Sequence, residues 1–257
     1  MKQAINKIIN VKNKKIIIPD GEQVFIFDYI NELSSQKTSS VLPIHIGQGA
    51  KVQYVLIVDP KIAKDFSIIR NIYLNDWSQM NSYQVYFGEG NYKVNINNDL
   101  GKEADLNNQV IFWQKKNQIL QVQDNYIFEG QGATGQFKIN GLVDDSASAQ
   151  YYSDVIIKKK AQLSSSRIDM RLYLLSPEAR GRLLPGLKIA ANDVKAGHSA
   201  STLNLSPEDL FYLQTRGLNS LQIKNLVINS IISQFVSKIS DSNTKDLILK
   251  LISERSS

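Results

Sequence analysis

Short apolar runs alternate with clusters of glycine, aspartate, asparagine and serine from residue 15 to about residue 194. Runs such as Gln23 to Phe27 and Lys51 to Val58 are rich in β-branched and aromatic residues, which favour strands. No convincing amphipathic helix interrupts them. This pattern predicts a mainly β region made of short strands joined by turns.

Three of the breaks between strands share a Gly-x-Gly pattern followed by a small residue. They are Gly47 to Ala50, Gly88 to Asn91 and Gly130 to Ala133, and their last residues are 41 and 42 positions apart. A looser copy recurs at Ala161 and Ala179, 18 residues apart. We therefore expect a structural repeat of roughly 20 residues that is sometimes skipped.

A repeat of this kind favours strands wound into a coil, one rung stacked on the next. At ~3.3 Å per residue, a 20-residue turn has a perimeter of about 65 Å, with sides of roughly four to six residues. A small residue after each glycine suits a tight corner that the next rung passes closely. An antiparallel sandwich is the alternative, although the hairpin pairs Asn-Gly and Asp-Gly are scarce.

The pattern changes at Ser206, where a helix is expected to begin. Ser206 is a suitable capping residue, the proline after it suits the first helical position, and acidic residues follow near the positive end of the helix dipole. The helix is expected to end at Arg216-Gly217. A second helix is predicted from Ser220 to about Ile239, and a third from about Thr244 to Ser253.

We therefore predict a coil over residues 1–205 and a helical region over residues 206–257. The second helix has an apolar surface wider than one face, with Ile223 and Leu226 outside its main stripe. The helices either cap the end of the coil or also dock a partner. The stripe itself consists of Leu221, Val227, Ile228, Ile231, Ile232, Phe235, Val236 and Ile239.

Composition excludes several kinds of site. The 257 residues include no cysteine, which excludes disulfides, thiolate metal sites and cysteine nucleophiles, and the two histidines cannot form a multi-histidine site. The net charge of +6 reflects a general richness in lysine, and Lys158 to Lys160 is interpreted as a solvated strand end, so no nucleic-acid partner is expected. No apolar run reaches the ~18 residues of a membrane span, and no signal peptide is seen, so a cytoplasmic location is expected.

The segment from Pro185 to Ser201 reads Pro-Gly-Leu-Lys-Ile-Ala-Ala-Asn-Asp-Val-Lys-Ala-Gly-His-Ser-Ala-Ser. It closely resembles a signature of the SufB/SufD family, Pro-x-Leu-x-Ile-x-x-Asp-Asp-Val-Lys-Cys-Ser-His-Gly-Ala-Thr. The segment from Leu210 to Leu218 is similar to the family's Leu-Phe-Tyr-Leu-x-Ser-Arg-Gly-Ile. The resemblance is strong from about Tyr83 to Ile239, and both motifs occur in the family's order.

The resemblance implies a right-handed parallel β-helix followed by C-terminal helices. It also implies a non-catalytic scaffold that assembles iron–sulfur clusters, pairs with a SufB-like protein or with itself, and binds a SufC-like ATPase through its helices. The cysteine of the signature is replaced by Ala196, whereas the histidine is kept as His198, which places the chain closer to SufD. We expect no cluster on the isolated chain, and a transient cluster at a subunit interface.

His198 is the candidate metal ligand, at the pairing surface opposite a partner's cysteine. The alternative is a histidine hydrogen-bonded at the last corner of the coil. His45, between two isoleucines, is interpreted as structural, and Asp193 is expected to act locally in the turn before His198.

Phe211, Tyr212, Arg216 and Gly217 are the candidate partner-binding residues. Packing of the tail against the coil is favoured for the two aromatic residues, and docking of the ATPase is the alternative. Arg216 is expected to pair with an acidic partner or with the carbonyls at the helix end. No Gly-x-x-x-x-Gly-Lys-Ser/Thr motif occurs, so ATP chemistry is assigned to a partner.

Two other functions remain open. A carbohydrate-active β-helix enzyme would need acids clustered on neighbouring rungs, and Asp144-Asp145 is the only acidic pair within the coil. A structural β-helix that polymerises end to end is disfavoured because the helices would block one stacking end.

Overall fold

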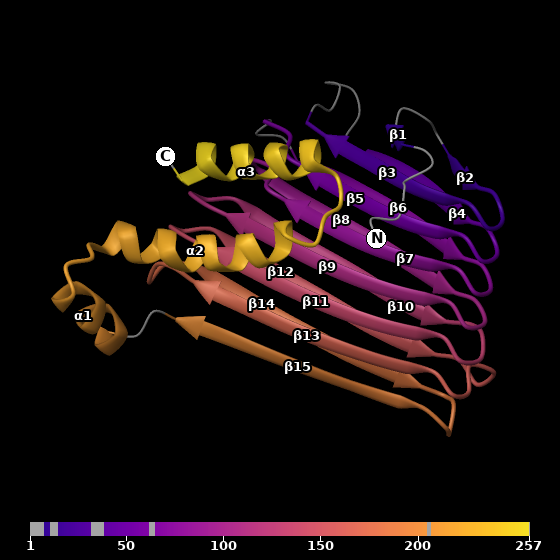
Figure 1. Cartoon of the computed structure of the whole chain (residues 1–257). Coiled ribbons are helices and arrows are strands. Elements are labelled where there is room, and N and C mark those ends of the chain that lie inside the picture. Colours follow the sequence, from indigo (N-terminus) through magenta and orange to yellow (C-terminus); the bar gives the residue numbers. More distant parts are fainter. Residues whose placement is uncertain (1–7, 11–14, 32–38, 62–64, 205–206, 257) are drawn as a thin grey trace.

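The strands of the chain wind into a parallel coil with two long faces. The computed structural model describes residues 8–10, 15–31, 39–61, 65–204 and 207–256 (Figure 1). Each full turn adds one strand to each of two sheets, so consecutive strands alternate between sheet A and sheet B, and each strand pairs with the strand two positions away in sequence. All pairs are parallel, as expected for a coil and not for an antiparallel sandwich.

Sheet A contains the odd-numbered strands β1 (Ile8–Asn10), β3 (Gln23–Ile30), β5 (Lys51–Val58), β7 (Gln79–Tyr86), β9 (Asp105–Gln114), β11 (Thr134–Val143), β13 (Ser165–Leu174) and β15 (Lys195–Asn204). Sheet B contains the even-numbered strands β2 (Ile16–Ile18), β4 (Ser39–Ile46), β6 (Phe66–Leu74), β8 (Asn91–Leu100), β10 (Ile119–Phe128), β12 (Ser148–Ile157) and β14 (Arg180–Ile189).

The repeat is longer than the sequence predicted. Lys51 pairs with Gln79 in the next rung, and Ser148 pairs with Arg180, so from β2 onward one rung takes 26 to 32 residues instead of about 20. The coil has two sides, and most of its later strands are ten residues long. The prediction failed because it assumed several short sides of four to six residues.

The Gly-x-Gly corners lie on two different edges of the coil. Gly47 to Ala50 and Gly130 to Ala133 each join a strand of sheet B to the next strand of sheet A, whereas Gly88 to Asn91 joins sheet A to sheet B. Their spacing of 41 and 42 residues is therefore about one and a half rungs. The small residue does pack inward, since Ala50 and Ala133 are fully buried.

The edge that leads from sheet B to sheet A carries one left-handed residue in most rungs. The N–H of Gly49 donates to the carbonyl of Asp76, and the N–H of Leu163 donates to the carbonyl of Asp193 at 2.6 Å, so each corner is bonded to the corner of the following rung. A left-handed backbone conformation favours glycine, but only some of these positions carry glycine. The left-handed residues on this edge are Gly21, Gly49, Trp77, Glu103, Gly132 and Leu163.

Inward-facing side chains of the two sheets form the core of the coil. The strands alternate buried and more exposed positions, as in β10 and β12, because successive side chains point to opposite faces. Paired residues in register share a face, so the core is built from columns of inward residues that run along the coil. One such column contains Val110, Ile139 and Met170 on neighbouring rungs, with inward neighbours at Phe137 and Ile168.

Three helices follow the coil: α1 (Pro207–Thr215), α2 (Ser220–Val236) and α3 (Ser242–Ser256). The helices α2 and α3 lie across the outer face of sheet A, and α1 projects beyond the sheet (Figure 1). Phe235 meets the ring of Tyr83 edge-on at 5.9 Å, and Lys224 Nζ lies 2.7 Å from Asp144 Oδ1. Neither α2 nor α3 therefore closes the end of the coil, which corrects one of the two roles expected for them.

The buried face of α2 differs slightly from the predicted stripe. Ile223, placed outside the stripe, is fully buried, and Leu221, placed within it, is 61% exposed. Both lie in the first turn of α2. Leu226 is exposed, as expected from its place outside the stripe. None of the helices in the described ranges is long and apolar enough to span a bilayer.

Candidate functional site at the open end of the coil

The last rung, β14 and β15, has an uncovered inner surface. Within the described residues, no strand lies beyond β15 in sheet A or beyond β14 in sheet B. Inward residues of earlier rungs are buried by the next rung, whereas the positions of β14 and β15 are intermediate or exposed. The inward positions of this rung are Leu183, Pro185, Leu187 and Ile189 from β14 and Ala196, His198, Ala200 and Thr202 from β15.

His198 lies in this uncovered layer. It pairs in register with Ile168, which is fully buried inside the coil, so the imidazole continues an inward column and is exposed only because no rung covers it. Among the described residues it has no hydrogen bond, ion pair or ring contact. The alternative role, a histidine hydrogen-bonded at the last corner, is therefore not what the structure shows.

Ala196, which replaces the cysteine of the family signature, lies two residues earlier on the same strand. It pairs with Ser166 and packs, half-buried, against the core. A side chain at this position shares the inner face of the coil with His198. The site of the missing thiol and the imidazole therefore lie on the same uncovered surface.

The corner before β15 is fixed by backbone contacts. The N–H of Asp193 donates to Gln162 Oε1 at 3.0 Å, and its carbonyl accepts from Leu163. These contacts agree with the local role expected for Asp193. His45, on the outer face of sheet B, stacks on Tyr73 with the ring centroids 4.6 Å apart, as expected for a structural residue.

The candidate partner-binding residues lie at the other end of β15, in α1 and the turn after it. Phe211 is 68% exposed and Tyr212 is 57% exposed, so the favoured prediction that they pack between the tail and the coil is wrong. The Arg216 guanidinium lies 5.4 Å from the centre of the Tyr212 ring. Gly217 ends the segment with a φ of +89°, a backbone conformation that favours glycine.

The predicted site residues therefore form two separate groups. Within the described part of the chain, no hydrogen bond, ion pair or ring contact joins His198 to Phe211, Tyr212, Arg216 or Gly217. No group of three or more histidine, aspartate or glutamate side chains in that part could hold a metal ion. If His198 binds a metal, the other ligands must come from outside these residues.

The acidic pair that an enzyme would need has structural contacts. Asp144 binds Lys224 of α2, and Asp145 Oδ2 accepts from the N–H of Lys116 at 2.9 Å. Lys158 to Lys160 is exposed in a turn, and Lys160 pairs with Glu129 at 3.2 Å. Asp144-Asp145 lies in a turn, as predicted, and Lys158 to Lys160 directly follows β12, as expected for a solvated strand end.

A buried polar network inside the coil was not predicted from the sequence. Asp124 Oδ2 accepts hydrogen bonds from Tyr126 at 2.6 Å, Tyr151 at 2.9 Å and Asn108 at 3.1 Å, and Oδ1 accepts from Asn98 at 3.1 Å. Burial raises the pKa of Asp124 to about 7, although the hydrogen bonds from the two tyrosines act in the opposite direction. The alternation of side chains along the strand could have predicted that Asp124 is buried, because Asp124 lies on the face of β10 that carries Leu120, Val122 and Phe128.

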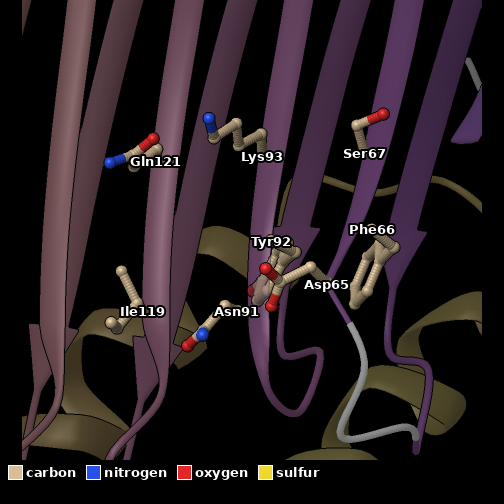
Figure 2. Close-up of a pocket in the computed structure, with 8 residues that line it drawn as sticks. All are labelled: Asp65, Phe66, Ser67, Asn91, Tyr92, Lys93, Ile119 and Gln121. Carbon is tan, nitrogen blue, oxygen red and sulfur yellow. The ribbon is translucent and has the colours of Figure 1, made fainter. Parts of the chain in front are cut away.

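A hollow of about 400 Å³ opens on sheet B, far along the coil from His198 (Figure 2). It lies over β6, β8 and β10, and its floor includes the stacked rings of Phe66 and Tyr92, 4.8 Å apart. Among the described residues that line it, only Asp65 and Lys93 are charged. It brings together no set of groups that would bind a metal, and it does not contribute to the open-end site.

Comparison with known proteins identifies a family. Residues 3–231 match the family described as "SUF system FeS cluster assembly, SufBD core domain". A SufBD family iron–sulfur cluster assembly protein of Synechocystis is 33% identical over 108 residues, which cover 42% of this chain and 24% of that protein. SufD of Bacillus subtilis is 29% identical over 126 residues, which cover 49% of this chain and 29% of that protein.

SufD of Escherichia coli aligns with most of the chain. It is 18% identical over 242 residues, which are 93% of this chain and 57% of that protein. The chain thus spans less than two thirds of the length of the curated relatives that it matches.

Proposed function

The chain belongs to the SufBD family of iron–sulfur cluster assembly proteins, and from this membership we propose that it is a SufD-like scaffold subunit. In this role the chain is non-catalytic. It pairs through the open end of its coil with a SufB-like protein, or with a second copy of itself, and it binds a SufC-like ATPase through its helical tail.

The uncovered last rung is the observation that carries the pairing proposal. Its apolar inner positions include Leu183 and Leu187, which are only partly buried. Both β14 and β15 are also edge strands, with one side of each backbone unpaired within the described residues. Exposed edges and apolar surfaces favour association with another chain. A second coil end would cover the surface and pair the edges.

The exposed tail residues support ATPase binding. Phe211 and Tyr212 are large, exposed aromatic side chains, and such residues with arginine are enriched at the energetic centres of interfaces. Arg216, against the Tyr212 ring, is held beside them. Packing within this chain leaves these aromatic side chains uncovered, so a partner surface is the proposed contact.

The cluster is cargo in this proposal, and the thiolates come from the partner. The chain has no cysteine and cannot supply the usual ligands of an iron–sulfur cluster. His198 contributes a neutral imidazole to the shared site, and imidazole is a suitable ligand for iron. Alone, the chain binds no cluster.

Co-expression with a cysteine-bearing SufB-like relative tests the pairing, with size-exclusion chromatography and light scattering as the measurement. Ala200→Arg places a charged side chain on the inner face of the open end, because Ala200 pairs with the buried Met170. Ser201→Arg is the matched control on the outer face of the same strand. We expect Ala200→Arg to block pairing while Ser201→Arg retains it.

The same measurement separates the two pairing modes. A dimer formed by the chain alone, sensitive to Ala200→Arg, would identify self-pairing. A chain that stays monomeric with the SufB-like relative, or that pairs equally well with both variants, would contradict the proposal. Circular dichroism of each variant checks that the coil remains folded.

A further inference from the structure

A small cationic groove lies where the tail crosses sheet A. It has a volume of about 90 Å³ and lies between β9, β11 and β13 of the coil and the end of α2. Lys138 of β11, Arg171 of β13 and Lys238 of the turn after α2 all line it, and none of the described lining residues carries a carboxylate. Three positive charges from three segments therefore face one small space.

These cations are not neutralised by ion pairs. No carboxylate of the described residues forms an ion pair with Lys138, Arg171 or Lys238. Asp169 is the nearest acidic group by register, since it pairs with Lys138 across the strands, but it lies outside the groove and accepts from Ser199 Oγ at 2.6 Å. Even with Asp169 counted, the local charge is positive. Like charges held close together repel unless an anion lies between them.

Neutral hydrogen-bonding groups complete the lining. Gln109 Oε1 accepts from Lys238 Nζ at 3.1 Å, so the position of the lysine is fixed by the coil, and Gln109 is itself almost fully buried. Gln109 and Asn140 both carry side-chain N–H donors. Carboxamides beside cations provide several donors at different angles, which suits an anion with several acceptor oxygens.

We propose that this groove binds a tetrahedral oxyanion, a phosphate group, which bridges the coil to the helical tail. The volume of about 90 Å³ is well below the ~300–1,000 Å³ of typical small-molecule sites, so the groove suits a single phosphate group and not a whole nucleotide. The site is independent of the open end and of the exposed aromatic residues of α1. The test of this groove is therefore independent of the tests of pairing and of ATPase binding.

The phosphate group can come from free phosphate or from an organic phosphate, and the surface beside the groove differs in how it would contact the two. Lys238 also lines a wider groove of about 650 Å³, together with Lys51 of β5 and Lys245 of α3, and no carboxylate lines it either. Small-molecule sites typically measure about 300–1,000 Å³. A free phosphate would use the small groove alone, whereas an organic phosphate would extend from it past Lys238.

Isothermal titration calorimetry of the full chain with inorganic phosphate, pyrophosphate and AMP tests the proposal. We expect saturable binding of at least one probe with a dissociation constant below ~1 mM. Arg171→Gln and Lys238→Gln should each weaken it by about tenfold or more, because each removes a charge-assisted contact. Lys51→Gln should weaken only the binding of AMP, which separates the organic source from the free anion.

Arg182→Gln is the matched control, since it removes an exposed arginine from the outer face of sheet B. Binding by this variant should equal that of the unaltered chain. Lys238 lies outside the regular strands and helices, so its variant keeps the test valid if Arg171→Gln fails to fold. Equal weakening by the control, or no saturable binding of any of the three probes, would overturn the proposal.

Discussion

Tyr126 donates a hydrogen bond of 2.6 Å to Asp124, two residues earlier on the same strand, and both side chains are fully buried inside the coil. Every partner of this carboxylate is uncharged: Asn98 from β8, Asn108 from β9, Tyr126 from β10 and Tyr151 from β12. No cation offsets its burial, which is why its pKa rises to about 7.

Asp124 therefore makes the stability of the coil depend on pH. Between about pH 4 and pH 7 the unfolded carboxyl is ionised while the folded one keeps its proton, so folding binds a proton and stability falls as the pH rises through this window. The change is on the order of 4 kcal/mol for a shift of about three units. Urea unfolding of the unaltered chain and of Asp124→Asn, at several pH values, measures it.

The free energy of unfolding of the unaltered chain minus that of Asp124→Asn should fall by on the order of 4 kcal/mol from pH 4 to pH 7. Below pH 4 this difference should stay constant. Glu178→Gln, at an exposed turn position, is the control and should show no such trend. A difference between Asp124→Asn and the unaltered chain that does not vary with pH would show that the carboxylate is ionised in the fold.

His198→Ala tests the open-end site. The side chain is exposed and forms no hydrogen bond or ion pair with the described residues, so the unfolding free energy should change by less than about 0.5 kcal/mol. Pairing should persist, while the iron retained by the assembled complex after anaerobic reconstitution should fall several-fold. Iron analysis and visible absorption of the complex provide the measurement.

His45→Ala is the control, because it removes the other histidine, which stacks on Tyr73 in sheet B. It should lower stability slightly and leave cluster yield unchanged. Normal yield with His198→Ala, or a loss of yield in parallel with stability, would assign His198 a structural role. A stable cluster on the isolated chain would contradict the premise that the thiolates come from a partner.

Phe211→Ser and Tyr212→Ser test ATPase binding. Both side chains face solvent, so the fold should be unaffected, whereas affinity for a SufC-like ATPase should fall by about tenfold or more if they are interface anchors. Leu249→Ser, at a 46% exposed position of α3, is the comparison. Point changes are preferable to removing the tail, because α2 and α3 cover an apolar face of sheet A that truncation would expose. Unchanged affinity in both variants would place the ATPase elsewhere.

Arg255 fixes the last turn of α3 to the coil. Its guanidinium donates to the carbonyls of Phe87 and Trp113, the latter at 3.1 Å, and to Gln118 Oε1 at 3.0 Å. Arg255→Met leaves these buried acceptors without a donor and should lower the unfolding free energy by about 3 kcal/mol. Lys250→Met, at a position with a 71% exposed side chain, should change it by less than about 0.5 kcal/mol. Urea denaturation of both variants gives the comparison.

Much of the architecture could be predicted because it follows from local signals. Alternation along the strands and the small residues after the corner glycines indicated a parallel coil, and Pro207 with the acidic residues after it indicated a helical tail. The predicted cap, Ser206, lies outside the described residues. The length of a rung could not be found this way. Trp77, Glu103 and Leu163 hold the left-handed corner positions that glycine holds elsewhere, so the glycine spacing skipped rungs and mixed two edges.

The placement of the tail and of the candidate site depended on contacts between distant residues. A helical wheel indicated that α2 buries a broad face, but not that its partner is sheet A, because outward residues such as Val55 and Trp113 look like ordinary strand positions. His198 was located by a motif alone. Its inward direction and its exposure both follow from the register with Ile168 and from the end of the coil, which no local pattern encodes.

The packing of α2 and α3 on sheet A sets an order of events during synthesis. A ribosome makes the strands first, and Phe25, Val55 and Trp113 emerge long before Ile232 and Ile252, which cover the same apolar cluster. Until the last helix leaves the ribosome, the finished rungs carry a broad uncovered apolar strip, of the kind that favours aggregation of partly made chains. The coil therefore depends on α2 and α3 for solubility, and termination before α3 is made would release a product that aggregates.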